Sequence, residues 1–355
     1  MASSFGERLK SARVMAGFSM DALVAKMNHL VSKQAISKYE NGLMSPDSSI
    51  LIAMSHALGV KIDYFFPSYE VSIGDINFRK KAALGKRSLD TLQARIKDNV
   101  ERYAELESFF PEILAFFNPL EGYLISEPAD IDRAAAKLRE AWGIGLGAPI
   151  SYLIDLLEEK GVRVLEIDEE DGFDGLSGWV DSRPFIVLNS LSPSDRKRLT
   201  ALHEYAHLSL KFDSVFSDAE KERLCHSFGS AFLLPYDALI KEIGEKRSHV
   251  SFYELINIKK QYGISMQAIM FRAKAYGIIS EYTYEAFSRE ISARGFRKNE
   301  PEKYPIDEYP TRFNQLLHRA ISEELVSISK AAYLANKSIE EIRSERLPAD
   351  ASAHS

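Results

Sequence analysis

Two histidines and a glutamate stand close together near the middle of the chain, in the run His203-Glu204-x-x-His207. On a helix, His203 and His207 lie one turn apart on the same face, so their imidazoles can hold one metal ion. Glu204 follows the first histidine directly and can act as general base on a water at the metal. This arrangement is typical of zinc metallopeptidases, so the pattern predicts a catalytic Zn²⁺ site.

The alternative interpretation is a surface helix that carries two solvated histidines. The apolar residues around the motif are Leu199, Leu202, Ala206, Leu208 and Leu210. They indicate that most of this helix is buried. Buried histidines and a buried glutamate need polar partners, and one metal ion can serve as the partner of both histidines.

A catalytic zinc ion has three protein ligands and an open position, so a third ligand must come from another element. The best candidate is Glu222, which lies 15 residues after His207 at the start of a helical pattern that Pro235 ends. His226, one turn further along the same face, is the rival ligand. The alternative for Glu222 is a solvated acid in the first turn of that helix.

These motifs resemble the ImmA/IrrE family of bacterial metallopeptidases. The similarity includes Gly175–Trp179 and Pro184–Asn189, which look like the family's edge strand and hairpin before the zinc helix. It also includes Glu222–Pro235, which is similar to the family's next helix. The resemblance implies a zinc site made of His203, His207 and Glu222, with Glu204 as the general base.

Two residues depart from the family's pattern, because Cys225 and His226 stand where the family usually has Ala and Asn. His226 could adjust the zinc or help to hold the scissile carbonyl, or it could be a neutral replacement. Cys225 could cap the zinc as an inhibitory thiolate. A small buried apolar side chain is the simpler role for this cysteine.

Residues Phe5 to Phe66 predict a compact unit of five helices that resembles the helix-turn-helix of the phage-repressor (XRE) family. The run Ile36–Gly42 is the most specific part of this resemblance. In such units the second helix of the motif enters the major groove of DNA. By that match, the predicted DNA contacts are Lys33, Gln34, Ser37 and Lys38. Because seven basic and five acidic residues leave a charge of only +2, the alternative is that this unit docks a protein.

The predicted fold class is α+β and mostly helical, with four successive regions. They are a helix-turn-helix domain at 1–67, a basic helical connector at 68–125, a zincin-like peptidase domain with a small mixed sheet at 126–290, and a helical region with a disordered tail at 291–355. We expect the connector's helix to pack on the peptidase or on a second subunit. Gly178–Asp181 is the predicted substrate-binding edge, because a peptide can add to a sheet as a further strand.

The composition agrees with two or three domains that have cores of their own, since 45% of the 355 residues are hydrophobic. One cysteine excludes an intramolecular disulfide and fits a reducing cytosol. We find no apolar run long enough to span a membrane and no secretory signal pattern. We therefore expect a cytoplasmic protein without a membrane partner.

Three functions are compatible with these patterns. The first, which the resemblance implies, is a zinc endopeptidase that cleaves a cognate transcriptional repressor and so switches on stress, mobile-element or anti-phage genes after DNA damage. Its expected partners are that repressor, DNA, single-stranded DNA as an activator, and a second copy in a homodimer.

The second function is a DNA-binding transcription regulator whose zinc domain senses a signal without proteolysis. The intact His203-Glu204-x-x-His207 disfavours this function. The third is an interaction protein with a structural metal, closed by a fourth ligand such as His226.

Overall fold

The computed structural model of the chain describes residues 5–66, 86–111, 113, 115–169, 172–180, 182–297 and 299–345. These residues divide into two compact units, which we describe separately. Unit 1 contains the described residues before 114 and those from 311 onwards, and unit 2 contains those from 115 to 310. Within the described residues, no helix is both long and apolar enough to cross a membrane.

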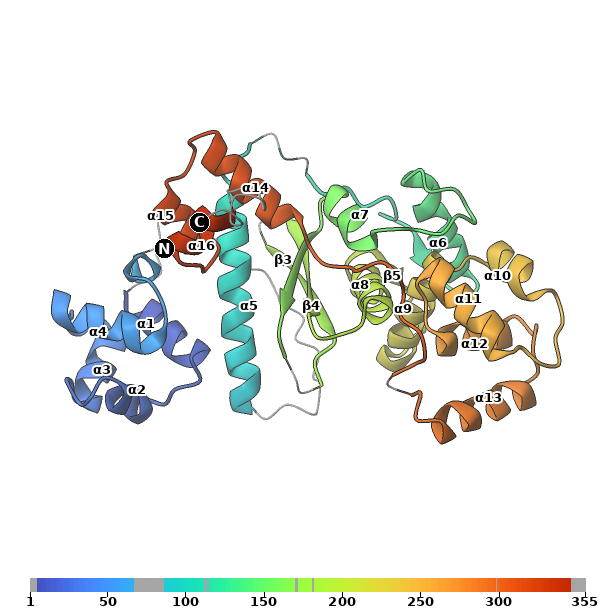
Figure 1. The fold of residues 1–355 in the computed structure, drawn as a ribbon, viewed down its shortest axis with the longest axis horizontal. Helices are drawn as coiled ribbons and strands as arrows, with labels where there is room; N and C mark the ends of the chain where they lie inside the picture. The colour runs from blue at the N-terminus through green and yellow to red at the C-terminus, as the bar shows by residue number, and fades with distance from the viewer. Residues whose placement is uncertain are drawn as a thin grey trace, which may run out of the picture. The chain divides into compact units, whose positions relative to one another are not determined.

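Unit 1 begins with the helix-turn-helix segment, coloured blue in Figure 1. Its elements are α1 (Phe5–Met15), α2 (Met20–Lys26), α3 (Lys33–Glu40), α4 (Ser48–Leu58) and the 3₁₀ helix η1 (Ile62–Phe65). The fifth predicted helix is therefore a single 3₁₀ turn. Ser19, Ser32 and Asp47 cap the helices α2, α3 and α4 with their side-chain oxygens, as their residue types favour.

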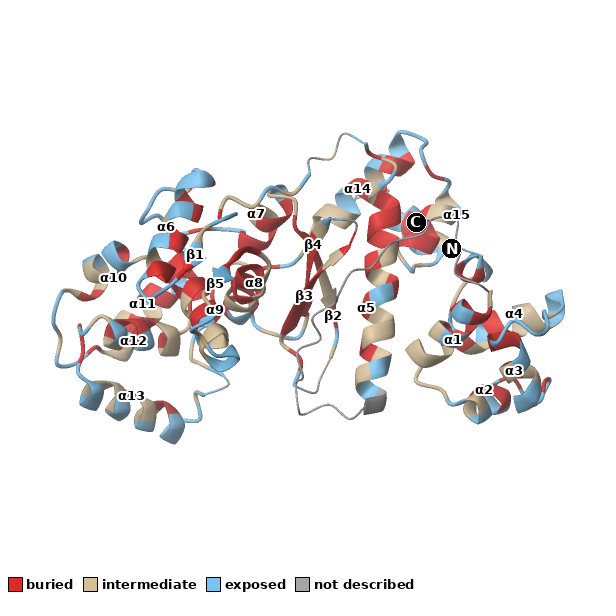
Figure 2. Cartoon of the chain, turned by 180° about the vertical axis from the view of Figure 1, so that it is seen from behind, coloured by how far each residue is buried: buried red, intermediate tan, exposed pale blue. Residues whose placement is uncertain are grey.

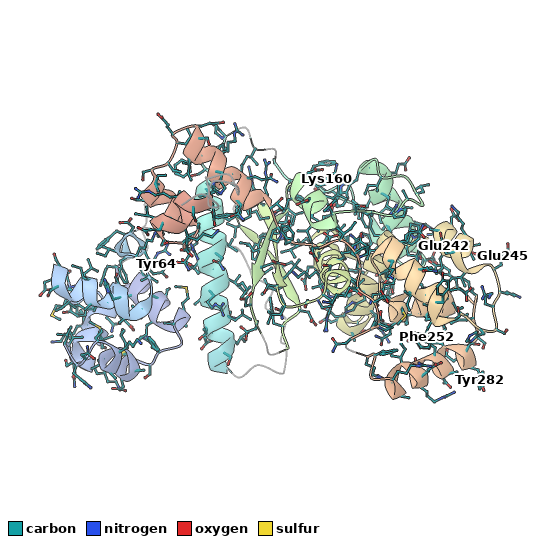
Figure 3. All side chains as sticks on the ribbon, in the orientation of Figure 1. Tyr64, Lys160, Glu242, Glu245, Phe252 and Tyr282 are labelled. Atoms are coloured by element: carbon teal, nitrogen blue, oxygen red, sulfur yellow. The ribbon has the colours of Figure 1, made fainter. Side chains whose placement is uncertain are left out.

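The first and third helices of this segment contact each other through a glycine and an ion pair. A Cβ atom at Gly6 would lie 2.4 Å from the carbonyl oxygen of Glu40, so only glycine allows this approach. The guanidinium of Arg13 donates hydrogen bonds of 2.6 and 2.9 Å to the carboxylate of Glu40. Arg8 of α1 also lies over the ring of Tyr64, which Figure 3 labels, at 5.5 Å. The contacts of Gly6 and Arg13 with Glu40 hold α3 in one orientation within the segment.

The remainder of unit 1 is helical. It consists of α5 (Lys86–Glu107), α14 (Arg312–Ser322), α15 (Ile328–Leu334) and α16 (Ile339–Glu345). The long helix α5 contacts α1 through the ion pair Arg8–Glu101 and α15 through the ion pair Lys330–Glu105, each at 2.6 Å. Among the described residues, the predicted helical C-terminal region thus contains three helices after residue 310.

The apolar face of α5 is used inside unit 1, because α1, α14 and α15 pack against this helix. Its residues Leu92, Ile96 and Val100 are almost completely buried there. The connector's helix is therefore grouped with the helix-turn-helix segment and the C-terminal helices. The compact units group segments that are far apart in the sequence and do not test the predicted region boundaries at 67, 125 and 290. These boundaries stay predictions.

Unit 2 contains a small mixed sheet, as predicted. The strands are β1 (Leu124–Ile125), β2 (Arg163–Ile167), β3 (Gly175–Val180), β4 (Arg183–Asn189) and β5 (Lys211–Phe212). The order β2-β4-β3 places β4 in the centre, parallel to β2 and antiparallel to β3, whereas β1 and β5 form a separate parallel pair. Within the described residues, β3 is an edge strand. Three residues of the predicted substrate edge, Gly178 to Val180, lie in β3, and Asp181 lies outside the described residues.

Eight described helices complete unit 2. They are α6 (Asp130–Ala141), α7 (Leu153–Glu159), α8 (Ser194–Ser209), α9 (Asp218–Leu233), α10 (Tyr236–Ile243), α11 (Phe252–Tyr262), α12 (Met266–Ala275) and α13 (Glu281–Ala293). The helix α8 lies between the sheet and α9 and contacts both. Figure 2 shows buried residues concentrated on α8 and on the neighbouring strands. The mostly helical α+β fold class is therefore confirmed.

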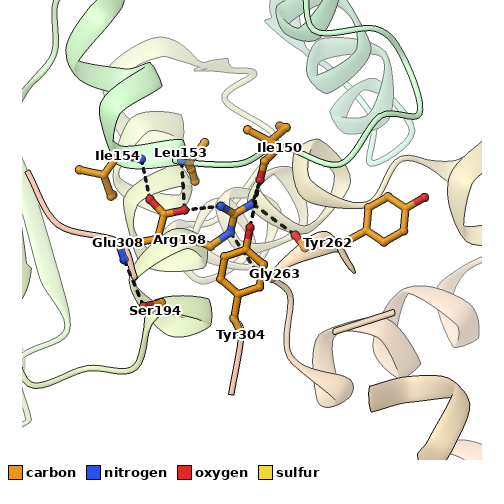
Figure 4. A network of polar contacts seen from close by, with 9 residues as sticks. All are labelled: Ile150, Leu153, Ile154, Ser194, Arg198, Tyr262, Gly263, Tyr304 and Glu308. Carbon is orange, nitrogen blue, oxygen red and sulfur yellow. Dashed lines mark hydrogen bonds and ion pairs between the residues drawn. The ribbon is translucent and has the colours of Figure 1, made fainter. Parts of the chain in front are cut away.

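A buried network fastens the segment after α13, which we call the return segment (residues 299–310), to α7 and α8 (Figure 4). The carboxylate of Glu308 accepts hydrogen bonds of 3.0 Å from the backbone N–H groups of Leu153 and Ile154 at the start of α7. The same carboxylate pairs with Arg198 of α8. Arg198 also donates to three backbone carbonyls, those of Ile150, Tyr262 and Gly263. Arg198 therefore links α8 to the return segment, to the residues before α7 and to the end of the helix that finishes at Tyr262.

Candidate metal centre

The antiparallel pair α8 and α9 forms the frame of the candidate site. A capping box of Ser217 and Glu220 starts α9, so the helix begins at a defined residue. Further along, a Cβ atom at Gly229 would lie 3.1 Å from Leu199 Cδ1 and 3.2 Å from Leu202 Cβ. The absence of that atom lets the two helices approach closely. Close approach brings the first turns of α9 to the second half of α8.

Three donor atoms converge at this contact. The Nε2 atoms of His203 and His207 lie 3.0 Å apart. The Oε2 atom of Glu222 lies 3.3 Å from the first and 3.4 Å from the second. For a tetrahedral ion with bonds of about 2.0–2.1 Å, neighbouring ligand atoms lie about 3.3 Å apart. The observed triangle therefore fits a tetrahedral metal ion. Among the described residues, these three side chains form the group of potential ligands that could hold a metal ion together.

The chemistry of the group also fits a metal with an open coordination position. Two imidazole nitrogens and one carboxylate oxygen are the ligand types that zinc accepts. The side chains of His203 and His207 are 10% and 7% exposed, whereas that of Glu222 is 39% exposed. The site is thus enclosed on the side of α8 and open to solvent at Glu222.

The candidate base Glu204 has a partner on the sheet. The hydroxyl of Ser177 in β3 donates a hydrogen bond of 2.8 Å to Oε2 of Glu204. Ser177 is buried, with 4% of its surface exposed. The start of β3 also lies close to α8, because a Cβ atom at Gly175 would come within 2.6 Å of Thr200 Cγ2. Ser177 was not predicted as a partner of Glu204, although a small polar residue among the glycines of a predicted edge strand was a signal for it.

Cys225 and His226 contact the two histidines but do not belong to the metal-binding group. Cys225 is fully buried, and its Sγ atom lies 3.3 Å from Nδ1 of His207. The ring of His226 stacks on that of His203 with the centroids 3.9 Å apart and the planes inclined by 30°. The rival third ligand, His226, is therefore a neighbour of His203 in this structure, whereas Glu222 joins the donor triangle.

The predicted DNA contacts all lie on α3 of unit 1. Lys33, Gln34 and Lys38 are exposed, and Ser37 is partly buried. The ammonium of Lys33 lies 2.7 Å from the carboxylate of Asp21 on α2, and both side chains are more than half exposed. Such an exposed pair is weak, so it leaves Lys33 available to a phosphate group. Contact of these four residues with DNA stays a prediction.

Two separate parts of the chain match known protein families. Residues 157–274 match the family model Peptidase_M78, which is described as the IrrE N-terminal-like domain. Residues 9–65 match the family model of the helix-turn-helix. The first match contains α8 and α9, and the second contains α3. The chain therefore combines an XRE-type helix-turn-helix domain, which implies DNA binding, with a domain of a metallopeptidase family.

Two curated proteins of Bacillus subtilis (strain 168) are similar to part of the chain. The HTH-type transcriptional regulator ImmR is 35% identical over 69 residues, which are 19% of this chain and 53% of ImmR. The SPbeta prophage-derived uncharacterized HTH-type transcriptional regulator YonR is 37% identical over 60 residues, which are 17% of this chain and 54% of YonR. The chain thus spans about half the length of these relatives.

Proposed function

We propose that this protein is a zinc endopeptidase that cleaves a cognate transcriptional repressor. The observation that carries this proposal is the triangle of donor atoms from His203, His207 and Glu222, with edges of 3.0–3.4 Å, beside Glu204. The match of this region to a metallopeptidase family supports it. Zn²⁺ held by the three residues would supply a Lewis acid that polarises a peptide carbonyl and acidifies water.

The residues of the chain perform the proton transfers in this proposal. The Glu204 carboxylate takes a proton from the attacking water and gives it to the leaving amine as the peptide bond breaks. Ser177 holds that carboxylate in one orientation through its hydrogen bond of 2.8 Å. The substrate backbone pairs with the edge of β3, which places an extended peptide beside Ser177 and Glu204. Only an extended segment can bind in this way, so cleavage is confined to exposed or unfolded stretches of the repressor.

The proposed substrate is a repressor of the helix-turn-helix type. The similarity of this chain to ImmR and YonR, both named as HTH-type transcriptional regulators, supports that choice. In this proposal the protein acts in the cytoplasm, alone or as a homodimer, and its helix-turn-helix domain contacts DNA. Cleavage relieves repression of stress, mobile-element or anti-phage genes after DNA damage, with single-stranded DNA as the activating signal.

The test is to incubate the full chain with the repressor encoded beside its own gene, with and without Zn²⁺ and with and without single-stranded DNA. We expect one zinc ion per chain and a discrete cut that requires Zn²⁺. Glu204→Gln should bind zinc normally and lose the cut, because an amide cannot accept the proton. His203→Ala should lose both.

The results of this experiment distinguish the peptidase from a transcription regulator without proteolysis. A cut by Glu204→Gln equal to that of the wild type would refute the role of this residue as the base. Normal zinc content without any cut, together with tight and salt-dependent binding to an operator, would favour the transcription regulator that senses a signal through its metal domain. The presence of the helix-turn-helix domain is the observation that keeps this second function under consideration.

A further inference from the structure

We infer that Cys225 and His226 are positioning residues, each of which orients one of the two metal-binding histidines. This inference rests on the proposed metal site and deepens it. The two residues are neighbours on α9, yet they contact different histidines of α8. Neither residue acts as a ligand, because their donor atoms are absent from the group that converges within 4.8 Å.

Cys225 orients His207 through the ring nitrogen that faces away from the donor triangle. Its Sγ atom is 3.3 Å from Nδ1 of His207, while Nε2 of the same ring points at His203 and Glu222. When Nε2 binds a metal, Nδ1 carries the proton and needs an acceptor. A carboxylate or a backbone carbonyl usually accepts that proton, whereas here a fully buried sulfur lies in the acceptor's place. Sulfur is a weak acceptor, so this contact is weaker than one to a carboxylate would be.

His226 orients His203 by covering one face of its ring. The two rings are nearly parallel, with the centroids 3.9 Å apart. On another side, the ring of His207 stands perpendicular to that of His203 with the centroids 4.5 Å apart. Between these two neighbours, His203 has little freedom to rotate about its ring torsion. Rotation would move Nε2 out of the donor triangle, so the stacked ring keeps the ligand in place before the metal arrives.

The spacing along α9 explains how one helix supplies both supports and the third ligand. Glu222, Cys225, His226 and Gly229 stand at positions i, i+3, i+4 and i+7, which share one face of a helix. Gly229 allows that face to lie against α8, because its missing Cβ atom leaves room for Leu199 and Leu202. The face of α9 that contacts α8 is therefore also the face that organises the metal centre.

The experiment measures the affinity of the full chain for Zn²⁺ by competition with a chromophoric chelator, and the absorption spectrum of the Co²⁺ form. Four variants make two matched pairs. Cys225→Ala removes the partner of His207, whereas Cys225→Ser keeps a hydrogen-bonding atom at that place. His226→Ala removes the stacked ring, whereas His226→Phe keeps a ring and removes both nitrogens.

We expect Cys225→Ala to lower the affinity about 10- to 100-fold and Cys225→Ser to restore most of it. We expect His226→Ala to lower the affinity several-fold, up to about tenfold, and His226→Phe to stay near the wild type. The Co²⁺ spectrum of the wild type should lack a sulfur-to-metal charge-transfer band. Thermal unfolding of each variant in the presence of chelator checks that the fold itself is kept.

Several results would overturn the inference. Equal zinc affinity in all four variants would show that neither residue positions a ligand. An equal loss in His226→Phe and His226→Ala would show that a nitrogen of His226 is required, and a charge-transfer band that disappears in Cys225→Ser would make Cys225 a ligand. If the wild type and His203→Ala both fail to bind zinc, the proposed function fails, and the inference fails with it.

Discussion

At the scale of single residues, Ser177 is the side chain whose role depends most directly on one contact. Its hydroxyl donates a hydrogen bond of 2.8 Å to Glu204 Oε2, and Ser177 is buried in β3. We predict that Ser177→Ala lowers kcat for repressor cleavage about 10- to 100-fold, because the Glu204 carboxylate then loses a donor that holds its orientation. KM should change little, since Ser177 presents its hydroxyl to Glu204 rather than to the substrate. Steady-state kinetics of the purified variant measure both constants.

Two controls sharpen this prediction. Ser177→Thr keeps the hydroxyl and should retain most of kcat. The zinc content of both variants should equal that of the wild type, because Ser177 contacts the base and not a ligand. An unchanged kcat in Ser177→Ala would mean that Glu204 needs no such partner.

At the scale of elements, the return segment is the clearest case of a stretch held by one buried side chain. The Glu308 side chain is 1% exposed, pairs with Arg198, and accepts two backbone hydrogen bonds at the start of α7. We predict that Glu308→Gln destabilises unit 2 by about 3–5 kcal/mol, because the charge of Arg198 then stays buried without its counter-ion. Urea unfolding followed by tryptophan fluorescence measures this, since both tryptophans of the chain, Trp142 and Trp179, lie in unit 2.

A matched substitution lies in the same segment. Glu302 forms an ion pair of 2.9 Å with Lys260, and both side chains are about half exposed. Glu302→Gln should therefore leave the free energy of unfolding almost unchanged. Equal losses from Glu302→Gln and Glu308→Gln would contradict the role that we assign to the buried network.

At the scale of the whole molecule, the predicted DNA contacts and the donor triangle lie in different units, so DNA binding and metal binding should be separable. We predict that Lys38→Ala weakens binding of the full chain to a random-sequence DNA duplex and reduces the slope of log K against log[KCl] by about 1, because one phosphate contact is lost. Its zinc content should stay at the wild-type value. Fluorescence anisotropy across a series of KCl concentrations measures the slope.

The reciprocal variants complete this test. His203→Ala should lose zinc and keep the wild-type DNA affinity. Lys241→Ala removes an equal charge from α10 in unit 2 and should leave the slope unchanged. A slope that falls equally in Lys38→Ala and Lys241→Ala would assign the effect to net charge and not to α3.

Local periodicity explains what could be predicted from the sequence. Residues four apart on a helix share a face, so His203 and His207 could be paired, and Glu204 placed next to them, before any tertiary structure was known. The helices α2, α3 and α4 begin after Ser19, Ser32 and Asp47, residue types that favour helix starts through contacts with neighbours only three residues away. The sequence by itself therefore determined the fold class, several helices of the helix-turn-helix segment and the motif of the candidate metal centre.

Contacts between distant residues were decided only by the tertiary structure. Ser177 and Glu204 are 27 residues apart, and Arg198 and Glu308 are 110 apart, so no local pattern relates them. The choice between Glu222 and His226 likewise depends on how closely α9 approaches α8. Gly229 allows this close approach because it has no Cβ atom. Helical spacing narrows such candidates to one face, but side-chain packing between elements selects which residue reaches the donor triangle.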